Sequence, residues 1–196
     1  NNLIFYHNGS TESMRIDSAG DVGIGVTPAT HARLTLGGTT TSYSSSLAFD
    51  NNTTGGATFF MLASDNTWSA GGNKFLMGHG APSSSAVDVT IDADGNVGIG
   101  TTSPAQKLSL SGASGSTRFS LERSNTNSTG GVGSIQWNAL DGHAVAGIAA
   151  LGDGNDEGAH LIFNTTSAAS SSDVYSSTTE RMRIDSSGNW MLGTTD

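Results

Sequence analysis

The sequence predicts an all-β protein: a repetitive, hairpin-rich trimer whose strands run interwoven or side by side around a three-fold axis. Three observations lead to this prediction. Short apolar runs alternate with polar residues, one motif recurs three times, and the apolar content is too low for a large core in a single chain. We take the motif first, because a repeat determines how every other segment is interpreted.

The repeated motif has the pattern Ile-Asp-x-x-Gly-[Asn/Asp], then three residues and a second Gly that follows Ile or Leu. Its copies start at Ile16, Ile91 and Ile184, which are 75 and 93 positions apart. The residues that define the three copies are Ile16, Asp17, Gly20 and Ile24, then Ile91, Asp92, Gly95 and Ile99, then Ile184, Asp185, Gly188 and Leu192.

The copies divide the chain into three segments. Residues 1–28 form a partial repeat with the first motif, residues 29–104 a full unit, and residues 105–196 a longer unit that ends in the third motif. The longer unit has about 18 additional residues, which we place near 144–160. Because insertions in repeat proteins map to surface loops, we expect this segment to form one.

Each motif predicts two strands joined by a tight turn. Met14, Ile16, Val22 and Ile24 alternate with polar residues or glycine, which is the period of a strand. Asp at the first position of a type I turn caps a backbone N–H, and Gly follows where φ is positive. The motif therefore predicts a hairpin with a bulge.

Glycines and prolines follow each turn. Glycine weakens a strand unless another group must approach closely, so the Gly-Ile-Gly segments indicate backbones packed near a shared axis. Pro28 and Pro104 end these runs. The Ala-rich stretch 144–151 is the best helix candidate, but Gly142 and Gly147 argue against a helix.

Composition indicates an oligomer. Leu, Ile, Val and Phe number only 37 residues, about 19%, beside 52 Ser or Thr and 27 Gly. Such a chain buries little apolar area alone, but it can fold if copies share a core. Three chains around one axis need one inward apolar row each, whereas a monomeric β-solenoid or sandwich needs more. We prefer the trimer and keep the monomer as the alternative.

Charge and residue content exclude several function classes. The formal net charge is −9 with two lysines, so there is no basic stripe for nucleic acid or anionic lipid. No run of about 18 apolar residues predicts membrane insertion. We expect no metal and no cofactor: the calcium-like pattern from Asp153 fails at Asn164, where a bidentate Glu is required, and the five histidines are widely separated. A three-His metal site on a trimer axis stays an open alternative.

Candidate binding residues come from two segments. Trp68 and Asp65 lie in a polar, loop-like stretch, where the indole would stack on a sugar or else pack beneath a turn or between chains. Trp137 lies in an alternating strand and is expected in the core. His143, Asp153 and Asp156 border or occupy the inserted segment. These residues are the receptor-binding candidates.

Two stretches carry a family resemblance. Residues 179–189 (Thr-Glu-Arg-Met-Arg-Ile-Asp-Ser-Ser-Gly-Asn) and 94–104 (Asp-Gly-Asn-Val-Gly-Ile-Gly-Thr-Thr-Ser-Pro) resemble the repeated segments of bacteriophage tail fibres and tail-appendage proteins, many of which end in an intramolecular chaperone. The resemblance implies a homotrimeric fibre on a virion, extracellular, bound to other tail proteins and to a host surface glycan or protein receptor. The third copy departs from the pattern, with Trp190-Met191-Leu192 in place of Val-Gly-Ile.

The sequence favours a structural and adhesive role without catalysis. No nucleophile motif or phosphate loop occurs. Two other functions remain as alternatives. One is a glycan depolymerase, for which the candidate catalytic carboxylates are Asp65, Asp141, Asp153 and Asp156. The other is a surface adhesin or filament subunit unrelated to phage.

Overall fold

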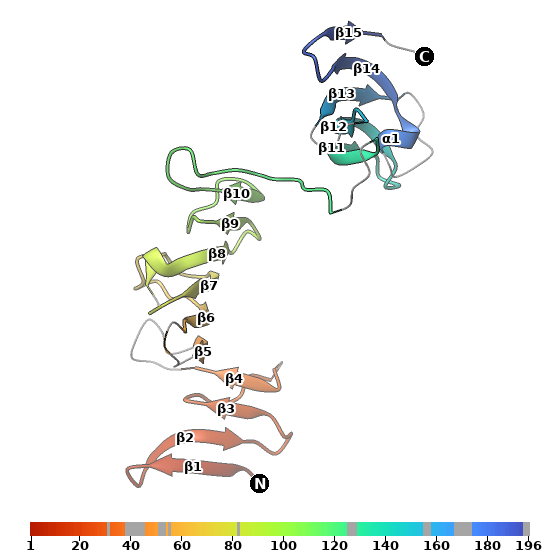
Figure 1. The fold of residues 1–196 in the computed structure, drawn as a ribbon. Coiled ribbons are helices and arrows are strands. Elements are labelled where there is room, and N and C mark those ends of the chain that lie inside the picture. The colour runs from red at the N-terminus through yellow and green to blue at the C-terminus, as the bar shows by residue number, and fades with distance from the viewer. Residues whose placement is uncertain are drawn as a thin grey trace. The chain divides into compact units, whose positions relative to one another are not determined.

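The computed structural model describes residues 1–30, 32–37, 46–50, 54, 56–81, 83–124, 129–154, 158–166 and 174–193. These residues form three open, mostly antiparallel sheets and two short helical turns, which confirms the all-β prediction (Figure 1). The chain divides into two compact units, Asn1–Arg118 and Phe119–Asp196, and each is described by itself. No helix among these residues is long and apolar enough to cross a membrane.

The first sheet follows chain order, and its strands are β1 (Leu3–His7), β2 (Thr11–Ile16), β3 (Val22–Ile24) and β4 (Leu34–Leu36). The first three strands are antiparallel, whereas β4 pairs with β3 in parallel. Two hydrogen bonds flank the pairing of β4 with β3: Val22 N–H donates to the Arg33 carbonyl, and Gly37 N–H donates to the Ile24 carbonyl.

The second sheet contains the same arrangement with two strands added before it. Its order is β10-β9-β8-β7-β6-β5, and only β9 and β10 are parallel. The strands are β5 (Ser46–Asp50), β6 (Thr58–Ala63), β7 (Phe75–His79), β8 (Val87–Ile91), β9 (Val97–Ile99) and β10 (Leu108–Leu110). A 3-10 turn, η1 (Ser84–Ala86), precedes β8.

The third sheet belongs to the second unit and is antiparallel throughout, in the order β11-β12-β13-β14-β15. Its strands are β11 (Gly131–Asn138), β12 (Ala144–Gly152), β13 (Ala159–Thr165), β14 (Thr179–Ile184) and β15 (Trp190–Leu192). A single helical turn, α1 (Val174–Ser177), precedes β14.

A tight hairpin turn lies at each of the three motifs. In the second, the Asp92 carboxylate accepts the N–H groups of Asp94 and Asn96, at 3.0 and 2.9 Å. Asp17 and Asp185 accept the corresponding N–H groups of their own turns. The turn glycine has φ of +84° at Gly20, +73° at Gly95 and +84° at Gly188, a conformation that a side chain disfavours. These contacts are the capping and the positive φ that the pattern predicts.

The glycines after each turn have a cause within one chain. A Cβ at Gly23 would lie 2.1 Å from the Val26 carbonyl oxygen, and one at Gly98 would lie 2.5 Å from the Thr101 carbonyl oxygen. The chain turns beneath these positions to begin its return to the parallel strand. The expectation that such glycines mark packing between chains is therefore not needed to explain them.

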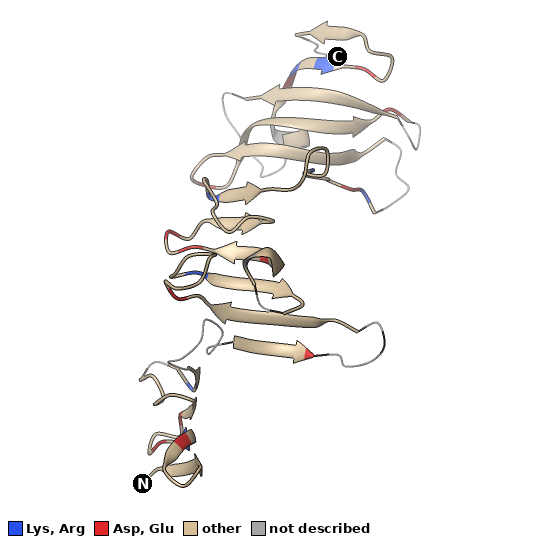
Figure 2. Cartoon of the chain, turned by 90° about the vertical axis from the view of Figure 1, so that its left-hand side faces the viewer, with Lys and Arg blue, Asp and Glu red and all other residues tan. Residues whose placement is uncertain are grey.

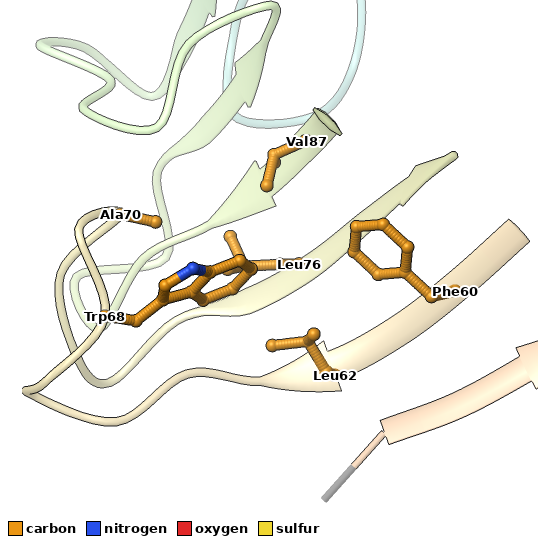
Figure 3. Close-up of a cluster of buried hydrophobic side chains, with 6 residues drawn as sticks. All are labelled: Phe60, Leu62, Trp68, Ala70, Leu76 and Val87. Atoms are coloured by element: carbon orange, nitrogen blue, oxygen red, sulfur yellow. The ribbon is translucent and has the colours of Figure 1, made fainter. Parts of the chain in front are cut away.

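One face of the second sheet carries a compact core, shown in Figure 3. The connection from β6 to β7 folds over this face and lays Trp68 and Ala70 on it. The buried residues of this cluster are Phe60, Leu62, Trp68, Ala70, Leu76 and Val87. The connection is itself fixed by Ser64, whose hydroxyl donates to the Gly71 carbonyl at 2.7 Å.

The third sheet is covered in a similar way by α1. Val174 is buried against Ala149 and Ile162, and the Tyr175 hydroxyl lies within hydrogen-bonding distance of the Gly133 and Ala150 carbonyl oxygens, at 2.9 and 3.1 Å. Gly147 leaves room for this turn, because a Cβ there would lie 2.3 Å from the Val174 side chain.

Residues 144–152 are not the surface loop that the sequence analysis expects. They form β12, which lies between β11 and β13, and Ala144 and Ala149 on it are buried. The alanines and glycines of this strand leave room for α1 to pack on it, which accounts for the Ala-rich sequence. The argument against a helix in this stretch is confirmed.

Candidate interaction surface

Each of the three sheets has an uncovered face that carries rows of apolar side chains. In the first sheet the register aligns Leu3 with Ile16, Ile16 with Val22, and Val22 with Leu34. A second row beside it is formed by Phe5, Met14, Ile24 and Leu36. None of these eight side chains is buried in the single chain, and Leu34 is 56% exposed.

The second sheet continues the pattern over six strands. The register places Leu47, Met61, Met77, Val89, Ile99 and Leu110 in one row. Phe75, Ile91, Val97 and Leu108 form the row beside it. All of these residues lie opposite the core beneath Trp68, because successive strand residues point to opposite faces. None of them is buried.

The third sheet presents the same two rows. One consists of Ile135, Ile148, Phe163, Met182 and Leu192, and the other of Ala150, Leu161, Ile184 and Trp190. Trp190 and Leu192 are 72% and 77% exposed. We call these uncovered apolar faces of the three sheets the open faces.

The repeated motif supplies the centre of each open face. Ile16, Ile91 and Ile184 lie in one row, and Ile24, Ile99 and Leu192 in the other. In antiparallel sheets with one face in water, that face is normally polar. Large contiguous apolar patches on a soluble chain mark interaction sites. The open faces are therefore the strongest candidate functional surface of this chain.

A β-bulge borders the apolar rows in each sheet and holds a polar pair there. His7 Nδ1 lies 2.5 Å from Ser13 Oγ, and His79 Nδ1 lies 2.7 Å from Asp88 Oδ2. In the third sheet Arg181 Nε donates to Thr165 Oγ1 at 2.9 Å. The bulges occur at Phe5/Tyr6, Met77/Gly78 and Phe163/Asn164. A bulge turns one additional side chain toward the open face, and here that side chain is always polar.

Two of the predicted binding residues have local structural roles. Trp68 is 7% exposed and packs in the core beneath its own connection, so its indole faces are covered. This is the packing alternative for Trp68. Asp65 accepts hydrogen bonds from the Thr67 hydroxyl and N–H, at 2.7 and 2.9 Å, and these bonds lower the pKa of its carboxyl. Asp65 therefore shapes the turn that carries Trp68.

Trp137 is expected in the core but is exposed in the structure. It lies on β11 and is 53% exposed, so it is not in the core of the single chain. Strand alternation identifies the two faces of β11, but not which of them the chain covers. Trp137 lies on the open face, where it aligns with Ala146.

The remaining candidates lie at opposite ends of β12. The His143 N–H donates to Asp141 Oδ1 at 3.1 Å in the turn before this strand, and Asp153 follows the strand. Asp156 lies outside the described residues. His143 and Asp153 therefore do not converge on one site, and no metal-binding group of three His, Asp or Glu occurs among the described residues.

Charged side chains are sparse on the sheets, and Figure 2 shows most of them in turns or at strand ends. Among those within strands, two ion pairs lie on the reverse of the open faces: Arg15 with Glu12 at 2.6 Å, and Arg183 with Glu180 at 2.7 Å. Each pair raises the pKa of its arginine through the hydrogen bond to the glutamate. From sequence, one inward apolar row is expected in each chain, and the motif residues lie in the open faces, but none of these residues is predicted as part of a binding surface.

The comparisons with known proteins leave the family open. No family model matches this chain, and a search of curated proteins finds no match to it. Any functional conclusion therefore depends on the surface itself and on the motif resemblance.

Proposed function

We propose that this chain is a structural and adhesive segment of a phage-type tail fibre, in which three copies associate through their open faces. The observation that carries the proposal is that two apolar rows recur, uncovered, in all three sheets. The motif resemblance supports the same function, and so does the low apolar content of the chain.

Burial of the open faces between copies accounts for where the apolar residues lie. Each buried Leu, Ile or Phe contributes about 1.5–3 kcal/mol relative to exposure. The exposed rows contain more large apolar side chains than the two intrachain clusters. Three copies that turn these rows toward a common axis would supply the core that the single chain lacks.

The assembly is tested by measuring mass in solution. Light scattering of the purified protein should give about three times the chain mass of 19.9 kDa. A monomer at all concentrations would overturn the proposal, because the open faces would then be in water.

A matched pair of substitutions locates the interface. Ile135→Asp places a charge on the open face, whereas Leu140→Asp places it at a fully exposed position in the adjacent turn. Ile135→Asp should dissociate the assembly or lower its Tm markedly, since three charges would be buried together. Leu140→Asp should change stability by less than about 0.5 kcal/mol. Equal effects of the two substitutions would remove the open face of the third sheet from the interface.

The adhesive role is a separate part of the proposal, in which three identical chains give avidity for a repetitive host-surface ligand. Fluorescently labelled protein should decorate the host cell, with other tail proteins holding the opposite end of the fibre in the particle. We propose no catalysis. Release of reducing ends from host polysaccharide would instead favour the depolymerase alternative.

A further inference from the structure

We infer that the outer corner of the second sheet is a carbohydrate-binding site, formed by Phe49, Phe59, His79 and Asp88. This inference rests on the proposed adhesive function and assigns it a place on the chain. Phe49, Phe59 and His79 form a third, shorter row on the same open face, next to the row that contains Met61, Met77 and Val89. The site therefore requires that the trimer proposed above leave this margin of the open face accessible.

The strand register assembles the corner. Phe49 on β5 pairs with Phe59 on β6, and Phe59 pairs with His79 on β7. The bulge at Met77/Gly78 then brings Asp88 of β8 to His79. Both phenylalanines are 57% exposed, and the Phe59 and His79 rings lie 6.4 Å apart between centroids.

A hollow of about 290 Å³ opens at this corner. Its walls are apolar, and among the described residues that line it Asp88 is the only charged one; they are Phe49, Phe59, Phe60, Met61, Met77, Gly78, Asp88 and Val89. His79 lies beside this lining, in contact with Asp88. Ligand sites have this character, with apolar and aromatic walls and a few placed polar groups. The volume is close to the lower limit of such sites, about 300 Å³, and suits a single ring.

The polar groups suit a sugar. Because a carboxylate only accepts hydrogen bonds, the 2.7 Å contact between His79 Nδ1 and Asp88 Oδ2 fits an Nδ1–H that donates to the carboxylate. Nε2 of the half-exposed imidazole and the second oxygen of the half-exposed carboxylate can then bond sugar hydroxyls. The exposed ring faces carry negative charge, which attracts the C–H groups on one face of a pyranose. Together they fit a neutral or amino hexopyranose; the carboxylate disfavours an acidic sugar.

The same corner of the third sheet supports this interpretation. Its equivalent residues are Trp137, Ala146, Thr165 and Arg181, again an exposed aromatic beside a bulge-held polar pair. In the first sheet the corresponding polar pair is His7–Ser13. In the second and third sheets, the exposed aromatics lie on the two strands that precede the arrangement shared with the first sheet.

The test is saturation-transfer NMR of the assembled protein with methyl glucoside, methyl galactoside, methyl mannoside and methyl N-acetylglucosaminide. At least one should receive saturation at its ring C–H protons. Phe59→Ser should weaken that binding about tenfold, and Asp88→Asn should weaken it by about tenfold or more. Phe119→Ser, at an aromatic that is 63% exposed and does not line the hollow, should leave the affinity unchanged.

Two results would overturn the site: no transfer to any of the four glycosides, or binding that Phe59→Ser and Asp88→Asn leave intact. Light scattering of the same samples separates this inference from the fibre proposal. A trimer without sugar binding removes the site and keeps the fibre. A monomer that binds sugar through Phe59 keeps the site and removes the trimer.

Discussion

The first and second sheets have the same open face but different reverse faces. In the first sheet, Glu12 and Arg15 form an ion pair at 2.6 Å on the reverse of β2. The corresponding residues on β8 are Val87 and Thr90, which are buried beside the core that contains Trp68. The reverse face is thus salt-bridged and partly exposed in one sheet and packed under its own connection in the other.

The difference indicates which face the repeats preserve for a common purpose. The reverse face changes with the segment that covers it, and the third sheet combines both solutions, with α1 over Ile162 and an ion pair between Arg183 and Glu180. The open face keeps two apolar rows in all three sheets. The open face is the feature common to all three sheets, and it is the surface that the proposed trimer would bury.

The largest difference in stability between the two reverse faces should appear when equivalent side chains, one in each sheet, are shortened to alanine. Leu76 is fully buried, whereas its equivalent Ile4 on β1 is only partly buried. Leu76→Ala should lower the free energy of unfolding of the second sheet by about 2–5 kcal/mol, because it leaves a cavity beneath Trp68. Ile4→Ala should lower that of the first sheet by about 1 kcal/mol.

Native-state hydrogen exchange measures these two effects separately, since it reports the local stability of each sheet. The amides of β7 and β2 are the reporters. Equal losses would mean that the reverse face of the first sheet is also covered, by a segment or a neighbouring copy that packs on it.

A smaller effect should come from exchanging the residues that follow the hairpins. Met191 occupies the position that Gly98 has in the second sheet. Gly98→Met should cost about 1–3 kcal/mol, because its Cβ would overlap the Thr101 carbonyl and displace the return to β10. Loss of amide protection at Val97, which donates to the Lys107 carbonyl, reports this displacement. Met191→Gly should lower the stability of the third sheet by less than Gly98→Met lowers that of the second. Equal losses of stability would mean that the overlap with the Thr101 carbonyl is not what makes Gly98→Met unfavourable.

The strands and hairpin turns could be predicted from sequence because their causes are local. Alternation around Ile16 and the sequence Asp17-x-x-Gly20 contain both the strand period and the turn chemistry. The parallel strands β4 and β10 could not be predicted, because three residues such as Leu34–Leu36 contain too little pattern to specify a partner. Their register depends on hydrogen bonds to β3 and β9 that form only after the chain turns back.

The site was harder to predict because exposure is a property of the assembled sheet. Trp68 lies in a polar, loop-like stretch and Trp137 in an alternating strand, yet the first is buried and the second exposed. The outcome depends on which face of each sheet the connecting segment covers. The corner at Phe49 and Phe59 combines residues from β5 to β8, and no single segment contains that arrangement.

The smallest effect concerns the turns, and it depends on pH. Backbone and side-chain hydrogen bonds from Asn96 lower the pKa of Asp92, and those from Asn189 lower the pKa of Asp185. A carboxyl whose pKa is lower in the folded than in the unfolded chain stabilises the fold above its unfolded pKa, near 4, and that contribution is lost as the pH falls through the folded value.

The double variant Asp92→Asn/Asp185→Asn should therefore be less stable than the wild type at pH 7, and its deficit should shrink below about pH 4. Thermal melts at pH 7, 5 and 3 measure how far the two stabilities converge. Asp94→Asn is the matched control, because the N–H groups of this turn donate to the Asp92 carboxylate and not to the Asp94 side chain. A deficit that stays constant across this range would mean that the carboxylates stabilise the turns by shape and hydrogen bonding alone. A deficit that narrows would show that the charge of the two carboxylates contributes to stability.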